Sequence, residues 1–346
     1  MKKENFGQTV SGQAATLYTL ENNNGMKIRV TDFGATLVNV VVKDKDGNDT
    51  DVVLGYDDVA GYEAGTCFFG ATVGRNANRI GGAAFELNGK HYELTANEKN
   101  NNLHSGLDFY NKRLWEVKNA GGDSVTFALF SPDKDQGYPG DLRIEVSYTL
   151  TEENEIRISY KGICSQDTIL NMTNHSYFNL NGEGGGTTLN HEVQIDSDAF
   201  TEIDEELIPT GVLSDVAGTP MDFTKAKLIG KEINEDFGPL NIAGGYDHNW
   251  VLKNRGKFEK VAEVFSKQTG IGMEIYTDLP GMQMYTSNGL EQEAGKGGKV
   301  YGKHGGICFE TQYFPDAIHH ENFEAPICKA DEIFQTKTIY KFKNIE

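Results

Sequence analysis

Short segments in which apolar and polar residues alternate recur along most of this 346-residue chain. Such alternation is typical of β-strands with one buried face, because successive side chains point to opposite sides of a sheet. Turn-forming pairs such as Asp46-Gly47 and Asn88-Gly89 interrupt the pattern, and the 40 glycines suit many tight turns. The alternating segments are 26–56, 83–94, 124–130, 142–150, 155–163, 191–196, 272–278 and 336–343.

This pattern predicts an all-β protein with mostly antiparallel strands. The sequence has no amphipathic helical stretches of the length and repetition that βαβ units need, and no repeat of the kind that builds propellers or solenoids. Because β-sandwiches often run to roughly 200–250 residues as one unit, length alone does not require two domains. We therefore expect a single large antiparallel β-sandwich that forms one domain over residues 1–346.

The charge and the apolar content restrict the partners. The formal net charge is -19, so nucleic acid and anionic membranes would be repelled. The N-terminal residues carry no apolar signal region, and no apolar run approaches the ~20 residues that span a bilayer, so we expect a cytoplasmic protein. The four cysteines are far apart without a CxxC pair, which fits reduced thiols and supports neither a zinc site nor a disulfide framework. They are Cys67, Cys164, Cys308 and Cys328.

The segment "NMTNHSYFNL", residues 171–180, places one histidine among amides, hydroxyls and aromatic rings. If it is a strand, one face is almost entirely hydrogen-bonding and carries no Lys, Glu or Asp, which favours a pocket wall shielded from bulk water. That face would hold Asn171, Thr173, His175, Tyr177 and Asn179. The alternative is a buried His175 bonded to a backbone carbonyl.

Three further segments hold side chains suited to catalysis: "NNNLHSG" with His104, "GGYDHNW" with Asp247, and "ICFETQYFPD" with Glu310. Glu310 alternates with Cys308 and Gln312 on one strand face, and a partly apolar setting would raise its pKa and make it a base near neutral pH. The alternatives are a solvent-facing carboxylate at Glu310 and turn-capping roles for His104 and Asp247. No histidine pair has metalloprotease-type spacing, so we expect no metal.

The glycine-rich segment "GATVGRNANRIGG", residues 70–82, matches neither of the common phosphate-binding loop patterns and lacks their strand-helix context. It contains two arginines, Arg75 and Arg79, which could be ion-pair partners in the scaffold or ligand-binding groups. The residue pattern alone leaves this choice open.

Taken together, these segments resemble the aldose 1-epimerase (galactose mutarotase) family, and the likeness is collinear over nearly the whole chain. It is carried by "VVLGYDDVAGY", "FFGATVGRNANRI", "LHSG", "GYPGDLRIEVSYTL", "NMTNHSYFNL", "IPTGVLSDVAGTPMDF", "GGYDHNWVL", "PGMQMYTSN" and "FETQYFPDAIHHENF". The resemblance implies a β-sandwich of the mutarotase type, a sugar bound in an open cleft across one sheet, and no metal or organic cofactor.

The resemblance also implies roles for single residues. It places the catalytic base at Glu310 and the acid at His175, with His104 binding the ring oxygen and polarising it. It favours Arg79 over Arg75, because the family's sugar-contacting arginine belongs to the "NR" pair that precedes the "LHSG" loop. The groups expected to hold sugar hydroxyls or to orient the acid are Asn78, Arg79, Tyr177, Asp247 and Gln283.

Two positions depart from the family pattern. Many relatives have a histidine after the "ETQ" of the base strand, where this chain has Tyr313, and Cys308 precedes the base by two positions. Both positions bear on the lining of the pocket and on sugar preference. Neither replaces a catalytic group.

The implied reaction interconverts the α and β anomers of a free aldohexose such as galactose or glucose, with a protonated His175 opposite an ionised Glu310. A glycosidase that uses Asp247 and Glu310 is an alternative, but it would leave both histidines without a role. A non-catalytic sugar-binding module usually offers exposed aromatic rings, and this chain has only two tryptophans. A phosphosugar epimerase fits poorly with the acidic charge balance.

Overall fold

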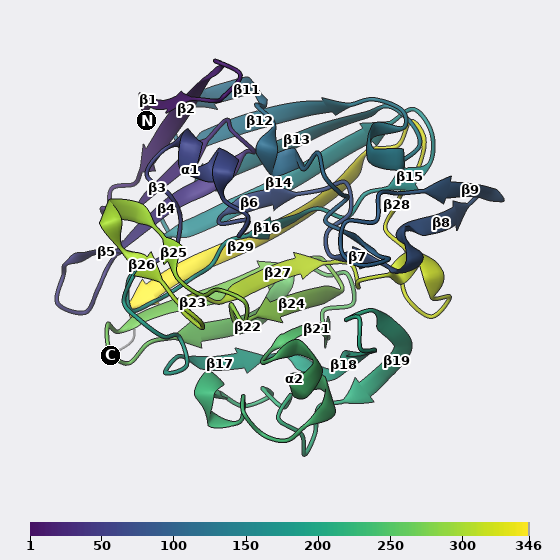
Figure 1. Ribbon diagram of the computed structural model, residues 1–346. Helices are drawn as coiled ribbons and strands as arrows, with labels where there is room; N and C mark the ends of the chain where they lie inside the picture. The colour runs from purple at the N-terminus through teal and green to yellow at the C-terminus, as the bar shows by residue number, and fades with distance from the viewer. Residues whose placement is uncertain (345–346) are drawn as a thin grey trace.

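Figure 1 shows the computed structural model of the chain, which describes residues 1–344. Most of its regular secondary structure is β-strand, and the two α-helices, α1 (Val59–Ala64) and α2 (Gly238–Ala243), have six residues each. Within the described range, neither helix has the length and apolar content that crossing a membrane would need. The prediction of an all-β protein is confirmed.

The largest sheet has nine antiparallel strands and crosses the whole molecule (Figure 1). Burial along β13 alternates strictly between buried and less buried positions, as the sequence pattern predicts for a strand with one covered face. In spatial order the strands are β11 (Glu116–Gly121), β12 (Ser124–Ser131), β13 (Leu142–Leu150), β14 (Glu155–Cys164), β29 (Phe334–Asn344), β23 (Ile271–Thr277), β22 (Glu259–Phe265), β17 (Glu192–Ile195) and β20 (Lys227–Leu228).

Two five-stranded antiparallel sheets form the opposite layer. The first contains β1 (Lys2–Gln8), β2 (Ala14–Glu21), β3 (Lys27–Thr31), β4 (Thr36–Lys43) and β5 (Asp49–Asp51). The second contains, in spatial order, β19 (Pro209–Asp215), β18 (Ser197–Ile203), β21 (Asp247–Leu252), β24 (Gly281–Tyr285) and β27 (Cys308–Gln312). One apolar cluster joins the layers, with Val30 and Met284 from the smaller sheets and Val146 and Ile275 from the large one. The fold is therefore a β-sandwich, as predicted.

The described residues also form five short strand pairs outside the three larger sheets. They are β6 (Ala71–Val73) with β16 (Thr173–His175), β7 (Arg79–Ile80) with β10 (Asn102–Leu103), β8 (Ala84–Leu87) with β9 (Lys90–Glu93), β15 (Thr168–Ile169) with β28 (Ile327–Cys328), and β25 (Glu293–Ala294) with β26 (Val300–Tyr301). The predicted Asn88-Gly89 turn joins β8 and β9, and both of its residues have the positive φ angles, 53° and 72°, that a type I′ turn requires.

The expected strand over residues 171–180 is shorter in the structure, where only Thr173–His175 form β16. All ten residues of the segment are buried, so it has no solvent-facing side. The neighbours of the segment change along its length: β6 pairs with Thr173–His175, whereas Asn171 and Phe178 form isolated bridges to other parts of the chain. This change of partner ends the strand after three residues.

Tertiary contacts bring β16 and β27 side by side, although more than a hundred residues separate them in the sequence. The hydroxyl of Thr173 donates a hydrogen bond of 2.9 Å to the backbone carbonyl of Thr311. On the other side of β27, β24 pairs Gln283 with Glu310, and β21 pairs Asn249 with Gln283. A continuous polar row on β21, β24 and β27 therefore ends beside His175.

Candidate active site

A cavity of about 220 Å³ opens beside β16, β21, β24 and β27. Its walls combine three strands of one five-stranded sheet with the short strands β7, β10 and β16 and the loops beside them. The lining residues are Phe68, Asn78, Arg79, Glu98, Leu103, His104, His175, Asp247, Tyr285 and Glu310. Six of the eight predicted site residues thus meet at one cavity, and the other two lie behind its wall.

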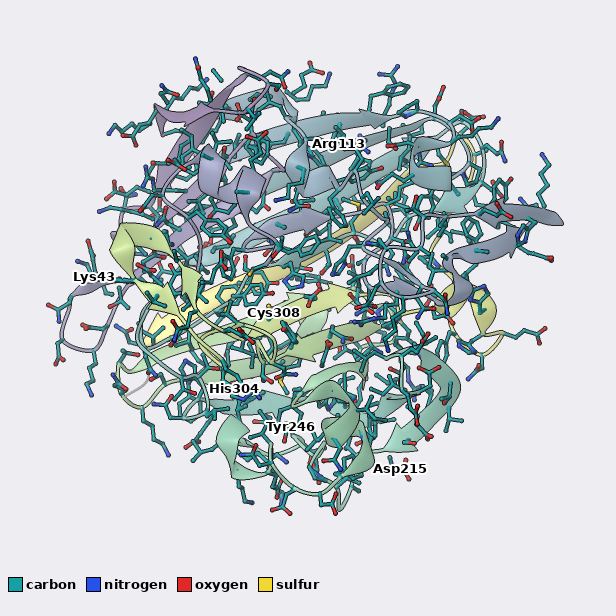
Figure 2. All side chains as sticks on the ribbon, viewed as in Figure 1. Lys43, Arg113, Asp215, Tyr246, His304 and Cys308 are labelled. Carbon is teal, nitrogen blue, oxygen red and sulfur yellow. The ribbon has the colours of Figure 1, made fainter. Side chains whose placement is uncertain are left out.

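Glu310 and His175 face each other across the contact between β27 and β16. Oε1 of Glu310 lies 3.6 Å from Nε2 of His175, and both side chains are almost completely buried. The other carboxylate oxygen, Oε2, is buried without a hydrogen-bond partner in the described part of the chain. Nδ1 of His175 lies 3.5 Å from Sγ of Cys308, a residue that Figure 2 labels near the centre of the molecule. The carboxylate therefore has an oxygen available for a ligand.

Burial shifts the pKa values of this pair in opposite directions. It lowers the pKa of His175 to about 4, because a charged imidazole loses hydration here. Burial and the charge of Asp247 raise the pKa of Glu310 well above its usual range, although Arg79 opposes this shift. Without a ligand, the site therefore favours a neutral His175 and a protonated Glu310. In this neutral pair, the one titrating proton is on Glu310. The ion pair expected from the sequence, a protonated His175 and an ionised Glu310, contains the same number of protons.

His104 is held by the loop that carries Asn78. The backbone N–H of Asn78 donates to Nδ1 of His104 over 3.1 Å, and the backbone N–H of His104 donates to the carbonyl of Asn78 over 3.0 Å. Because Nδ1 accepts a hydrogen bond, the neutral ring carries its proton on Nε2. Burial, His175 and Arg79 lower the pKa of His104 well below its usual value, so this ring is a neutral hydrogen-bond donor.

Arg79 forms a two-point ion pair with Glu98 at the cavity. Nε and Nη2 of Arg79 donate to the two carboxylate oxygens over 2.5 and 2.9 Å. Arg79 is buried whereas the Glu98 side chain is 31% exposed, so the carboxylate reaches the rim of the cavity. The two hydrogen bonds to Glu98 fix the orientation of the planar guanidinium. The directions of its remaining N–H groups are therefore fixed as well.

Asp247 is oriented from behind by Gln283, whose Nε2 donates to Oδ1 of Asp247 over 2.7 Å. Burial raises the pKa of Asp247, and both Arg79 and this hydrogen bond oppose the shift. Gln283 does not line the cavity, and its Oε1 is buried without a partner among the described residues. Gln283 therefore holds Asp247 in place, and the direct sugar contact expected from the sequence stays a prediction.

Aromatic rings surround the two histidines. Tyr177 stacks beneath His175 with ring centroids 5.1 Å apart and does not line the cavity. Phe68 lines the cavity and packs on both histidines, with centroids 4.9 Å from His104 and 5.8 Å from His175. Its φ of 58° is unfavourable for a bulky side chain, and such strain persists only where the surroundings hold it in place.

Comparisons with known proteins match this chain over nearly its whole length. The sequence profile described as aldose 1-epimerase matches residues 16–341. The chain is 41% identical over 338 residues to the galactose mutarotase of Bos taurus, covering 97% of each chain. It is 36% identical over 334 residues to the aldose 1-epimerase of Escherichia coli K12, covering 96% of each.

The chain belongs to the aldose 1-epimerase family.

Solved structures agree with this assignment. An aldose epimerase homologue from C. elegans superimposes with a TM-score of 0.90 at 29% identity and covers 96% of this chain and 100% of its own. A galactose 1-epimerase from Lactobacillus acidophilus NCFM gives a TM-score of 0.87 at 26% identity, covering 100% and 99%. The aldose 1-epimerase fold therefore extends over essentially the whole chain.

Four cavity residues of this aldose 1-epimerase were not predicted from the sequence: Phe68, Glu98, Leu103 and Tyr285. Phe68 and Leu103 lie in the motifs "FFGATVGRNANRI" and "LHSG", so the motifs could have identified both residues as candidates for the cavity wall. Glu98 is one of many acidic residues in the chain, and only its contact with Arg79 distinguishes it.

The two arginines of the glycine-rich segment have different environments. Arg79 lines the cavity, whereas Arg75 is buried and donates to backbone carbonyls such as Pro139 and Gly140 and to the hydroxyl of Ser131. Arg75 therefore holds several loops together.

Tyr313, one of the two departures from the family pattern, packs against Phe334 and does not line the cavity.

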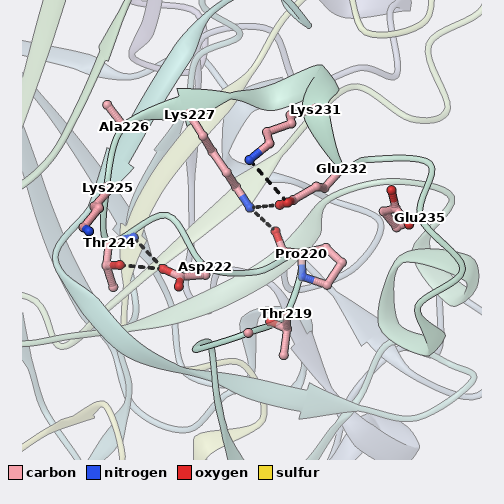
Figure 3. A pocket seen from close by; sticks show the side chains of 11 residues that line it. Thr219, Pro220, Asp222, Thr224, Lys225, Ala226, Lys227, Lys231, Glu232 and Glu235 are labelled. Carbon is pink, nitrogen blue, oxygen red and sulfur yellow. Dashed lines mark hydrogen bonds and ion pairs between the residues drawn. The ribbon is translucent and has the colours of Figure 1, made fainter.

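A second hollow, of about 580 Å³, lies near α2 and is shown in Figure 3. Several of its charged groups already have partners: Lys227 pairs with Glu232 and donates to the carbonyl of Pro220 over 2.7 Å, and Asp222 accepts from Thr224. Because these groups are already paired, the hollow offers no acid-base arrangement like that of Glu310 and His175.

Proposed function

We propose that this aldose 1-epimerase interconverts the α and β anomers of free aldohexoses such as galactose and glucose, with Glu310 and His175 as the proton-transferring pair. The observation that carries this proposal is the 3.6 Å separation of Oε1 of Glu310 and Nε2 of His175 beside the cavity. The unpartnered Oε2 of Glu310 supports it, because a buried carboxylate oxygen requires a hydrogen-bond donor and a sugar hydroxyl is one.

The reaction needs two proton transfers and no electron transfer. One group removes the proton of the anomeric hydroxyl while another delivers a proton to the ring oxygen, and the ring opens to the aldehyde. Rotation about the C1–C2 bond presents the other face, and the reverse transfers close the ring. Each positioned proton-transfer group typically contributes about 10²- to 10⁴-fold to the rate.

The active form of the pair carries one proton. With that proton on His175, Glu310 is the base and His175 the acid, as the family pattern implies. The pKa shifts favour the proton on Glu310 in the empty site, and a bound sugar hydroxyl that donates to the carboxylate would favour the ionised form of Glu310. Since both forms contain the same number of protons, this change needs no net uptake or release of a proton.

The remaining polar groups bind and orient the sugar. We assign Asn78, Arg79, His104 and Asp247 to its oxygen atoms, with Nε2–H of His104 as the donor to the ring oxygen. Gln283 and Tyr177 act behind this layer, where they orient Asp247 and His175. The cavity of about 220 Å³ is smaller than the ~300–1,000 Å³ of sites for drug-sized ligands, which suits a single monosaccharide.

Polarimetry of freshly dissolved α-galactose, with and without the protein, tests the proposal. We expect the optical rotation to reach its equilibrium value far faster with the enzyme than in buffer. Methyl and nitrophenyl galactosides should stay intact, because the anomeric oxygen then carries no proton for Glu310 to remove. A glycosidase would behave in the opposite way. Release of nitrophenol at an enzymatic rate without accelerated mutarotation would refute the proposal.

We further propose that residues 1–346 act as one domain, which is supported by a family match that spans 16–341 and by a cavity whose walls come from both halves of the chain. A cytoplasmic location is supported by the four free thiols within the described residues.

A further inference from the structure

Cys308 has no role in the proton transfers, yet its Sγ lies 3.5 Å from Nδ1 of the proposed acid, His175. It alternates with Glu310 on β27, so both side chains point to the same side of the strand, and His175 approaches from β16. One donor atom from each of the three residues lies within 4.8 Å of the others. A thiol, an imidazole and a carboxylate therefore converge on one point.

The spacing of these donors is close to that of a tetrahedral metal site. Zinc binds sulfur at about 2.3 Å, nitrogen at about 2.0–2.1 Å and carboxylate oxygen at about 2.0–2.2 Å, which places the donors roughly 3.3–3.7 Å apart. Oε1 of Glu310 and Nε2 of His175 are already 3.6 Å apart. Sγ of Cys308 lies 3.5 Å from Nδ1, which is the other nitrogen of the ring, and one ligand atom from each of the three residues lies within 4.8 Å of the other two, so the donors must close by up to about 1 Å to surround one ion.

The donors are also free to bind a ligand. Oε2 of Glu310 has no partner in the described residues, and the only hydrogen bond described for the Cys308 thiol is its 3.5 Å contact with His175. Asp247 adds a second carboxylate nearby, and Arg79 is the cation that opposes binding. The combination of sulfur and nitrogen donors selects zinc-like cations over magnesium or calcium, which prefer oxygen.

We propose that Cys308, His175 and Glu310 form a binding site for a thiophilic divalent cation such as Zn²⁺, and that this cation inhibits the enzyme by occupying its acid and its base together. Binding displaces two protons to solvent, one from the thiol and one from the Glu310–His175 pair, and involves no redox step. The adjacent cavity leaves room for water as a fourth ligand. The inhibition rests on the proposed function, whereas the binding does not.

The binding is tested with Co²⁺, which replaces zinc and gives a thiolate-to-cobalt charge-transfer band in the near ultraviolet. We expect this band with the wild-type protein and its loss in Cys308→Ser and Cys308→Ala. Cys67→Ser is the matched control, because Cys67 is the only one of the four thiols that is not buried in the described structure, and it should keep the band. A band that disappears in Cys67→Ser and persists in both Cys308 variants would overturn the site. Circular dichroism establishes that each variant is folded.

The inhibition is tested by polarimetry with Zn²⁺. We expect inhibition that is competitive with galactose, reversed by EDTA, absent with Mg²⁺ at the same concentration, and weakened at least tenfold in Cys308→Ser. Equal inhibition by Mg²⁺, or zinc inhibition that galactose does not relieve, would refute the inhibitory role. If the protein shows no mutarotation but keeps the Cys308-dependent cobalt band, the proposed function fails and the metal site stands.

Discussion

Replacing Glu310 by glutamine removes the proposed base and keeps the shape of its side chain. The amide oxygen can still accept a hydrogen bond from the anomeric hydroxyl, but it cannot take the proton. Because Glu310 is 2% exposed, bulk water cannot reach the anomeric oxygen from that side and act in its place. His175, whose Nε2 lies 3.6 Å from Oε1 of Glu310, is already assigned to the ring oxygen.

These features place the loss of rate in the upper part of the range for general bases. We expect Glu310→Gln to lower kcat by about 10³- to 10⁴-fold, which corresponds to about 4–5.5 kcal/mol of transition-state stabilisation. The KM for galactose should change by less than about tenfold, because Asn78, Arg79 and Asp247 still bind the sugar.

The assay is polarimetry of α-galactose over a range of concentrations, which separates kcat from KM. Glu293→Gln is the control: Glu293 is half-buried and accepts a hydrogen bond of 2.6 Å from Tyr56, but it does not line the cavity. This control should retain nearly all of its activity. If Glu310→Gln kept more than a tenth of the wild-type kcat, Glu310 would not be the base.

The same variant makes a prediction about stability. Burial raises the pKa of Glu310 in the folded state above its unfolded value, so the folded protein holds this proton more tightly. The free energy of unfolding then falls by up to about 1.4 kcal/mol per pH unit as the pH rises from the unfolded pKa, about 4.3, through the folded pKa. Glu310→Gln lacks this loss, so urea denaturation should show it gaining stability relative to wild type as the pH rises. A difference that is independent of pH would contradict the raised pKa.

Other substitutions test the remaining roles. His175→Asn should lower kcat about as much as Glu310→Gln, and His104→Gln should lower it by about 10²-fold or less; the reverse order in polarimetry would exchange the two assignments. Arg79→Ala should raise KM for galactose about tenfold or more and also lower kcat, because a displaced ring oxygen is a poor target for the acid. Arg75→Ala should instead lower the free energy of unfolding in urea by about 3 kcal/mol or more, since it leaves several buried acceptors unpaired; a fully stable variant would contradict the scaffold role. Phe68→Leu should lower kcat about tenfold through looser packing on both histidines, whereas Phe68→Tyr, which keeps the aromatic ring, should retain most of the wild-type kcat. Equal activity of Phe68→Leu and wild type would show that the strained ring has no part in the reaction.

The sequence could predict the strands because the signal for a strand is local. Alternation in segments such as 142–150 and the Asn88-Gly89 turn depend on neighbouring residues alone, and both appear in the structure where they were expected. The segment 171–180 shows the limit of this reasoning. Its pattern is that of a strand, but its hydrogen-bonding partners change along its length, and those partners are distant in the sequence.

The resemblance to a family predicted the site residues from motifs that can also be read in the sequence. Motifs spread over the chain named Glu310, His175 and His104, and the structure places all three at one cavity. They could not show that Gln283 stands behind Asp247, because which of two polar residues faces a cavity depends on the register of β21 and β24. Nor could they identify Glu98, whose contact with Arg79 arises only when the loop between β9 and β10 folds over β7.

The sequence by itself determined the β-sandwich class and the types of group that the chemistry uses, since alternation, turns and motifs are properties of the chain. Only the tertiary structure decided their distances and their charges. The separation of 3.6 Å between Glu310 and His175 requires β16 and β27 to be neighbours, and strand order is set by contacts between residues far apart in sequence. The opposite pKa shifts of the pair require that water be excluded from both side chains, which only the assembled sheets and loops can do.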